Sequence, residues 1–172
     1  MVEIPTVESE RLVLRGHRVD DLEDCAAMWG DPEVTRHISG RSFSREDVWI
    51  KLQRHVGHWY LKGFGFWLMN EKASGRFVGE VGFADFKRDI GPSIEGLPEI
   101  GWVLTPSAHG KGLATEAART ALAWLETRFG VMRTACLIAP ANTRSIRVAQ
   151  KCGYTESTRT TYKDQPTILM HR

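Results

Sequence analysis

The sequence lacks the features that mark secreted and membrane-spanning proteins. Its 172 residues include only 3 cysteines, Cys25, Cys136 and Cys152, and no pair of them has the CxxC spacing of a metal or redox motif. An odd number of widely separated cysteines predicts reduced thiols in a cytoplasmic protein. No apolar run approaches the roughly 20 residues that cross a bilayer. The acidic N-terminal segment also lacks the basic and apolar regions of a signal peptide.

The sequence also lacks a large excess of charge of either sign. Lys and Arg number 23 against 21 Asp and Glu, so the formal net charge is +2 and no basic arm for nucleic acid is expected. Hydrophobic residues make up 42% and charged residues 26%, as in ordinary soluble globular proteins. No linker, internal repeat or low-complexity stretch divides the chain. We therefore expect one soluble domain over residues 1–172, monomeric or homodimeric, with no membrane attachment.

The hydrophobic periodicity predicts a mixed α/β (α+β) fold with the element order β-α-α-β-β-β-α-β-α-β-β. Ser44, at the start of a capping-box-like Ser-Arg-Glu-Asp, is expected to begin the second helix and Gly63 to end it. Strands are expected at 11–18, 64–69, 77–86, 98–104 and 134–139, with two more after residue 153 that separate near residues 164–166. Helices are expected at 20–29, 44–62, 113–129 and 142–152, and an exposed loop at 87–97.

The most informative segment is the glycine-rich junction between the strand at 98–104 and the helix at 113–129. Gly110 and Gly112 allow the backbone to turn its N–H groups toward one point, and the following helix adds the positive end of its dipole. This arrangement suits a phosphate. It is neither a P-loop, because Thr105 replaces the first glycine, nor a dinucleotide fingerprint, because Thr115 replaces the third.

Three segments together resemble the GNAT superfamily of acyl-CoA-dependent N-acetyltransferases. The segment His109-Gly-Lys-Gly-Leu-Ala114 is similar to the family's [QR]-x-x-G-x-[GA] loop, and residues 142–154 are similar to N-x-x-S-x-x-[VL]-x-x-K-x-G-[FY]. Glu99-Ile-Gly-Trp102 resembles the E-I-G-[YW] of the RimJ/RimL-type branch. His109, which stands where Gln or Arg is usual, and the Ala-Thr-Glu-Ala at 114–117 also resemble that branch.

This resemblance implies a central, mostly antiparallel twisted sheet of six to seven strands with about four helices. It also implies that acetyl-CoA is the cosubstrate and that no metal is needed. Main-chain groups of Trp102, Val103 and Leu104 would contact the pantetheine. The loop that would hold the pyrophosphate consists of His109, Gly110, Lys111, Gly112, Leu113, Ala114 and Thr115. Asn142 would touch the pantetheine arm, and Ser145 would lie near the CoA sulfur.

The resemblance assigns the catalytic groups unevenly. Many relatives place a tyrosine general acid where this chain has Ala149, so Ser145 becomes the expected proton donor. Glu99 is the first candidate for the general base, with Glu80 and Asp85 as competitors, and a water chain is a further possibility.

The function expected from these residues is acetyl transfer from acetyl-CoA to a primary amine, by direct attack in a ternary complex. The acceptor is either a protein N-terminus, including that of a ribosomal protein, or a small amine. The alternative is a non-catalytic acyl-CoA-binding sensor, which the alanine at position 149 favours. A phosphate-binding NTPase is a third interpretation. His55 and His58 have a spacing that can hold zinc, but no third ligand lies near them in sequence, so no metal is expected.

Overall fold

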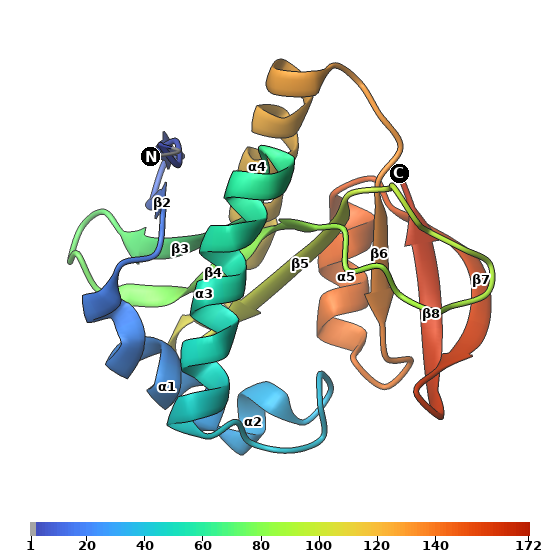
Figure 1. Ribbon diagram of the computed structural model, residues 1–172, viewed down its shortest axis with the longest axis horizontal. Helices are drawn as coiled ribbons and strands as arrows, with labels where there is room; N and C mark the ends of the chain where they lie inside the picture. Colours follow the sequence, from blue (N-terminus) through green and yellow to red (C-terminus); the bar gives the residue numbers. More distant parts are fainter. Residues whose placement is uncertain (1–2) are drawn as a thin grey trace.

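The structure is a computed structural model that describes residues 3–172, and its centre is one eight-stranded sheet (Figure 1). The strand order is β1-β2-β3-β4-β5-β6-β8-β7. The strands are β1 (Val7–Glu8), β2 (Leu12–Arg15), β3 (Phe66–Glu71), β4 (Phe77–Ala84), β5 (Glu99–Leu104), β6 (Ala135–Ile138), β7 (Thr155–Tyr162) and β8 (Gln165–His171). The helices are α1 (Leu22–Gly30), α2 (Pro32–Thr35), α3 (Arg45–Lys62), α4 (Leu113–Phe129) and α5 (Thr143–Lys151).

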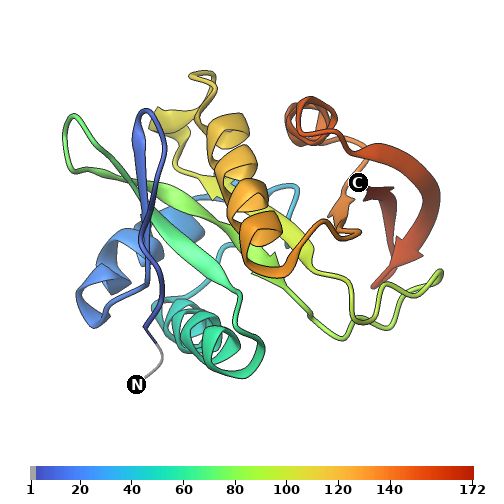
Figure 2. The ribbon, with the colours of Figure 1, turned by 90° about the horizontal axis from the view of Figure 1, so that it is seen from above.

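Helices cover both faces of the sheet. Helices α1 and α3 lie on one face and α4 on the other, with α5 beside the strands at the C-terminal end of the order (Figure 2). Helix α4 packs closely because its inward side is built from small residues, and Ala117, Ala118 and Ala121 are buried with Leu122 and Leu125 in the main core. Small side chains allow the helix axis to approach the sheet, which fixes the position of its N-terminus.

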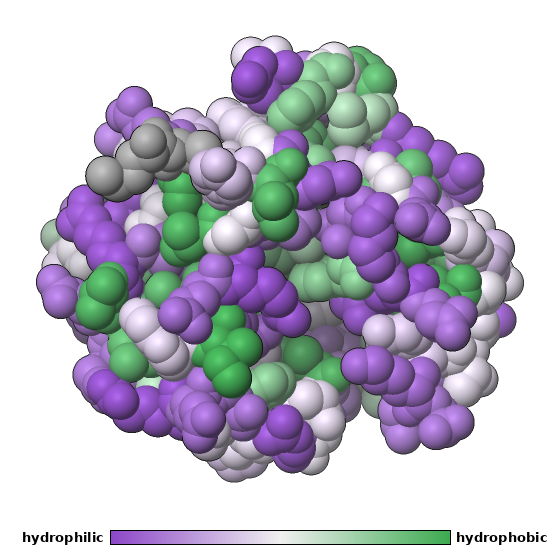
Figure 3. Space-filling model, viewed as in Figure 1, coloured by the Kyte–Doolittle hydropathy of each residue, from purple (hydrophilic) through white to green (hydrophobic). Residues whose placement is uncertain are grey.

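The sheet is interrupted between β5 and β6. These strands are parallel and form one register pair, Glu99 with Ala135, whereas β5 pairs with β4 over the whole length of β5. Beyond Glu99 the two strands diverge, and Gly101, Trp102 and Val103 are partly exposed although they lie in the middle of the sheet. The α3 face is hollowed at its centre, with hydrophobic residues on the floor and hydrophilic ones on both sides (Figure 3). We call this opening the split; its closed end is at Glu99 and its open end is beyond Leu104.

The fold class and the mostly antiparallel sheet are confirmed, and the counts differ. The sheet has eight strands rather than six or seven, and there are five α-helices rather than about four. The additional elements are β1 and α2, which have 2 and 4 residues and are too short to show a periodic pattern. Strand β5, helix α4 and strand β6 follow one another, and β5 pairs parallel to β6, so these three elements form a βαβ unit.

Some element boundaries differ by a few residues from those expected. Strand β3 extends through Glu71 rather than ending at residue 69, and the first helix begins at Leu22, after a 3₁₀ turn, rather than at residue 20. The expected start and end of α3 are confirmed: Ser44 forms a capping box with Asp47, and Gly63 ends the helix in the left-handed conformation. Within residues 3–172, none of the helices combines the length and the apolar character that crossing a bilayer requires.

Candidate functional site

The N-terminus of α4 is an open cradle of backbone donors. Gly112 is its N-cap residue, with φ of 77°, and Gly110 has φ of 75°, conformations that favour glycine. No side chain in residues 3–172 caps this helix. The first-turn amides of Leu113, Ala114 and Thr115 have no partners within the helix and can therefore donate to an outside anion. The helix dipole adds partial positive charge at the same point, so the cradle fits a phosphate group.

A network of ionic hydrogen bonds fixes the cradle against the sheet. Arg11, at the start of β2, donates from Nη1 to the carbonyl oxygen of Lys111 at 2.9 Å and from Nε to Oε2 of Glu116 at 2.7 Å. The other oxygen of Glu116 accepts from the backbone N–H of Arg11 at 2.8 Å and from the hydroxyl of Ser9 at 2.6 Å. The first turn of α4 is therefore held in place without a side chain entering the cradle.

His109 connects the cradle to two other elements. Its Nε2 lies 3.0 Å from the carbonyl oxygen of Leu104, so this nitrogen carries the proton and donates. Its Nδ1 can then accept from Nη1 of Arg144, which lies at 3.4 Å, at the start of α5. The imidazole thus ties the glycine loop to the end of β5 and to α5.

The N-terminus of α5 meets β5 across the split. Asn142 is the N-cap, and its Oδ1 accepts from the backbone N–H of Ser145 at 3.2 Å. The indole Nε1 of Trp102 lies 3.3 Å from Ser145 Oγ, and an indole can only donate. The Ser145 hydroxyl therefore acts as the acceptor in this bond, and its own proton remains free for another partner.

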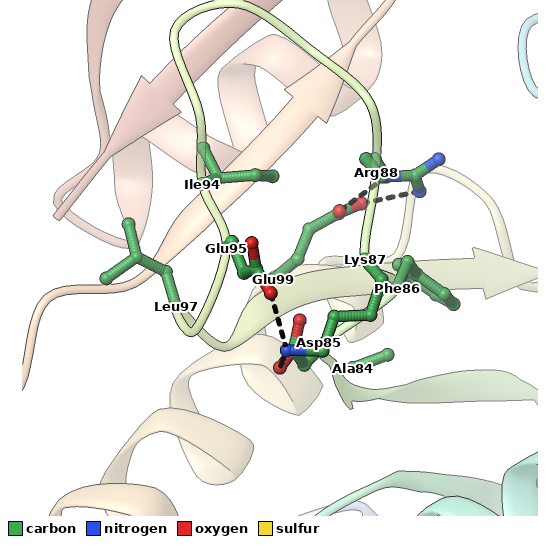
Figure 4. Close-up of a pocket in the computed structure, with 9 residues that line it drawn as sticks. All are labelled: Ala84, Asp85, Phe86, Lys87, Arg88, Ile94, Glu95, Leu97 and Glu99. Carbon is green, nitrogen blue, oxygen red and sulfur yellow. Dashed lines mark hydrogen bonds and ion pairs between the residues drawn. The ribbon is translucent and has the colours of Figure 1, made fainter.

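Glu99 lies at the closed end of the split, bound to one arginine. Its Oε2 accepts from Arg88 Nε at 2.6 Å and its Oε1 from Arg88 Nη2 at 2.8 Å (Figure 4). Burial raises the pKa of the Glu99 carboxyl, against the opposing effect of Arg88. Side chains alternate along β5, so Glu99 faces the same side as Val103, which packs beneath α1, whereas Trp102 faces the other side. The structure therefore does not bring Glu99 and Ser145 together; they lie on opposite faces of the strand.

Glu80 is the centre of a buried polar cluster whose members lie far apart in the sequence. It is 2% exposed, and its carboxylate accepts from His17 Nε2 at 2.7 Å and Trp29 Nε1 at 2.8 Å. Burial would raise the pKa of Glu80, but the His17 hydrogen bond and neighbouring positive charge lower it to about 2. His55 Nε2 lies 3.9 Å from the same carboxylate and has no hydrogen-bond partner among residues 3–172.

Three buried side chains at this cluster are of types that can bind metals. Ligand atoms of His17, Cys25 and Glu80 lie within 4.8 Å of one another. Burial and the charge of Glu80 raise the pKa of the Cys25 thiol far above its usual range, so the thiol keeps its proton, whereas metal binding needs the thiolate. The contacts among these residues therefore fit a hydrogen-bonded cluster that holds α1 to β4.

Asp85 and His58, the remaining candidates from the sequence, contact each other. His58 Nε2 accepts from the backbone N–H of Asp85 at 3.0 Å, and its Nδ1 donates to the carbonyl oxygen of Phe64 at 2.7 Å. Burial lowers the pKa of His58, which keeps the ring neutral, as this pattern requires. The carboxylate of Asp85 forms ion pairs with Lys62 and Lys87. Both residues thus link α3 to the end of β4.

Ala149, which stands where many relatives have a tyrosine, lies in the core. Ala149 on α5 is fully buried and contributes no polar group. Tyr154, three residues beyond the end of α5, is buried in the core, and its hydroxyl lies 2.6 Å from Thr134 Oγ1. Ser145 is therefore the hydroxyl that α5 presents beside β5.

The comparisons with known proteins agree with this geometry. The acetyltransferase (GNAT) domain family matches residues 11–155. YkkB of Bacillus subtilis is 34% identical over 131 residues, which are 73% of this chain and 70% of YkkB. A Bordetella pertussis structure assigned to the GnaT-family acetyltransferases is 27% identical, with a TM-score of 0.87 over 98% of this chain and 99% of that chain. RimL, a ribosomal L7/L12 alpha-N-protein acetyltransferase solved with coenzyme A, is 14% identical, with a TM-score of 0.78 over 98% and 97% of the two chains.

Proposed function

Because this chain belongs to the GNAT acetyltransferase family, we propose that it transfers an acetyl group from acetyl-CoA to a primary amine by direct attack in a ternary complex. The observation that carries the proposal is the split between β5 and β6, whose open end adjoins the uncapped N-terminus of α4. An unpaired strand edge offers backbone groups to an extended ligand, and the cradle offers donors to its phosphates.

The donor would lie along the split with its pyrophosphate in the loop from His109 to Thr115. Its pantetheine amides would bond the main chain of Trp102, Val103 and Leu104, because this edge of β5 has no strand partner. Asn142 at the start of α5 would border the same arm. The thioester would then reach toward the closed end of the split, and RimL with bound coenzyme A shows that a protein of this fold accommodates such a ligand.

Ser145 and Glu99 divide the proton transfers between the two faces of β5. The neutral amine attacks the thioester carbon, a C–N bond forms, and the C–S bond breaks as the carbonyl is restored. Ser145, whose oxygen accepts from Trp102, donates its own proton to the departing sulfur and regains one from solvent water, to which the proton collected by Glu99 is finally released. Glu99, directly or through a water, takes the proton that the amine loses, and its raised pKa favours this role.

The decisive experiment is an acceptor screen. The protein would be incubated with acetyl-CoA and with peptides bearing free N-termini, amino acids, polyamines and aminoglycosides, while free thiol and N-acetylated product are measured. Thiol release that depends on the amine supports the enzyme. Tight CoA binding without turnover of any amine would favour the acyl-CoA-binding sensor, for which the buried Ala149 is the specific observation. Failure to bind CoA would refute the donor assignment.

Both acceptor classes, a protein N-terminus and a small amine, belong in the screen. RimL acts on a protein N-terminus, but at 14% identity its similarity to this chain supports a shared fold and not a shared acceptor. We also propose a cytoplasmic location and a place in the RimJ/RimL-type branch. The three cysteines are free and buried, which suits a reducing compartment.

A further inference from the structure

Three cationic side chains gather on the α3 face of the sheet, near the closed end of the split. Lys51 and Arg54 lie one turn apart on α3, and Arg88 follows β4. The guanidinium carbons of Arg54 and Arg88 lie 5.4 Å and 4.6 Å from the centroid of the Phe86 ring, so the two groups share one aromatic surface. Nζ of Lys51 lies 4.0 Å from the centroid of the Trp29 ring.

Two of these cations have no counter-ion. Among residues 3–172, neither the ammonium of Lys51 nor the guanidinium of Arg54 forms a hydrogen bond or an ion pair, whereas Arg88 is bound to Glu99. Burial lowers the pKa of Lys51 to about 8, with Glu80 opposing and Arg54 and Arg88 adding to the effect. Burial and the charge of Arg88 also lower the pKa of Arg54. Lys51 is partly buried and Arg54 is exposed, so the two like charges lie close together where an anion from solution can reach them.

The available carboxylates on this face do not neutralise the cluster. Glu80 accepts hydrogen bonds from His17 and Trp29, and Glu99 accepts two from Arg88. Lys51 is close enough to be influenced by Glu80 without forming a hydrogen bond to it. Among residues 3–172 the unused hydrogen-bond donors of the cluster are therefore those of Lys51 and Arg54 together with Nη1 of Arg88, and they can bind an acceptor from outside the chain.

The cluster adjoins the place where the proposed reaction would occur. Arg88 bonds the residue at which β5 and β6 part, Glu99. On the same face the Phe66 ring covers Gly101, where a Cβ atom would lie 2.9 Å from Phe66 Cζ, and the Phe86 ring lies 6.5 Å from Phe66. An aromatic floor thus connects the middle of β5 to the cations. The α4 cradle lies at the other end of the strand, so a second substrate has the α3 face free for its approach.

We propose that Lys51, Arg54 and Arg88 form an anion subsite and that the amine acceptor carries a carboxylate or a phosphate near its amino group. This inference rests on the proposed acetyl transfer and deepens it. The amine remains neutral for attack, while the anion is held by the ammonium of Lys51 and by the planar guanidinium forks. Polyamines and other acceptors with additional positive charge would be repelled by the same three groups.

The first arm of the test compares acceptors that differ only in the acidic group. The pairs are β-alanine with β-alaninamide and phosphoethanolamine with ethanolamine, and they separate a carboxylate from a phosphate. We expect kcat/KM to be at least about 10-fold higher for the acidic members, since a hydrogen bond to a charged group contributes about a factor of 10. Equal turnover of the pairs, or preference for spermidine, would overturn the subsite and leave acetyl transfer intact.

Variants connect that preference to the cluster. The double variant Lys51→Met and Arg54→Met keeps the aliphatic packing and should lower kcat/KM for the acidic acceptor about 100-fold, with acetyl-CoA affinity unchanged. Arg45→Met is the matched control, because Arg45 lies on the same helix and pairs with Glu23 at the surface. A preference for acids that survives the double variant would refute the assignment.

The second arm does not depend on turnover. Inorganic phosphate would be titrated into the CoA-saturated protein while the thermal midpoint is measured, so the α4 cradle is already filled. We expect phosphate to raise the midpoint of the wild type and of the Arg45 variant, but not that of the double variant. Equal shifts in all three, or none in the wild type, would show that no anion subsite exists. A wild type that binds phosphate in this way but acetylates no amine would instead contradict the proposed function alone.

Discussion

Replacing Glu80 by alanine should be among the most destabilising single changes in this protein. The carboxylate is fully enclosed and accepts from His17 and Trp29 at 2.7 Å and 2.8 Å, both of which would lose their acceptor in the interior. Breaking a buried charged pair from one side costs about 3–5 kcal/mol, because the remaining polar groups stay desolvated. A domain of this size loses about 2–4 °C of midpoint per kcal/mol, so we expect a fall of about 6–20 °C.

Thermal unfolding followed by circular dichroism measures this effect. Glu23→Ala is the control, since Glu23 also pairs with an arginine but lies on the surface, where such pairs contribute little. Its midpoint should stay close to that of the wild type. A Glu80→Ala midpoint equal to that of the control would refute the view that this cluster holds α1 to the sheet.

The same carboxylate gives the stability a defined dependence on pH. The folded state lowers the pKa of Glu80 from 4.5 to about 2, so between these values the unfolded chain binds a proton that the folded chain does not. Stability from this group is therefore fully present above pH 4.5 and is lost as the pH falls toward 2. The stability difference between the wild type and Glu80→Gln should shrink over this interval in acid-dependent unfolding. A difference that is constant with pH would contradict the lowered pKa.

The remaining predictions concern the donor site and the backbone. Gly112→Asp should abolish acetyl-CoA binding in titration calorimetry by placing a negative charge in the cradle, while Gly112→Asn, with the same shape, should keep measurable affinity. Ser145→Ala should lower kcat with little change in acetyl-CoA affinity, and an unaltered rate would remove Ser145 from the mechanism. Gly57→Ala should raise the thermal midpoint by about 1–4 °C, because nothing lies within 4 Å of the added methyl group and alanine favours a helix by about 0.5–1 kcal/mol. Gly82→Ala should prevent folding into a soluble protein, since its Cβ would lie 2.2 Å from the carbonyl oxygen of Gly65.

The elements that sequence alone predicted well are those with local signals. Helix α3 begins at Ser44 and ends at Gly63 because a capping box and a left-handed glycine act within a few residues of the helix ends. Strand β1 has no such signal, since it exists through the pairing of Val7 with Leu14. Helix α2 has a start signal, with Asp31 as N-cap before Pro32, but its single turn is too short to show a periodic pattern. Tertiary context defines these short elements, so periodicity could not reveal them.

In the candidate site, too, the local features could be predicted from the sequence and the long-range contacts could not. The α4 cradle is one continuous segment, and its glycines and helix start could be predicted from the sequence. The contact of Trp102 with Ser145 spans 43 residues and that of His17 with Glu80 spans 63, and no spacing rule predicts either pair. A charge count could have suggested that Glu80, in an otherwise apolar strand, needs a buried partner, but it could not have identified that partner.

In proteins of this fold, the donor cradle and the acceptor site can change independently of each other. The donor cradle follows from a strand, a loop and a helix in sequence, so it can persist while the rest of the chain changes. The proposed anion subsite instead combines α3 with the segment after β4, and its two residues on α3 can be replaced without disturbing the cradle or the sheet. Lys51 and Arg54 point from a helix surface, where substitution costs little packing, and only Arg88 is tied to the sheet through Glu99. Acceptor choice should therefore follow the residues at positions 51, 54 and 88 rather than the glycine loop, and two chains with the same loop but different residues at these positions should differ in the charge of the amine they acetylate.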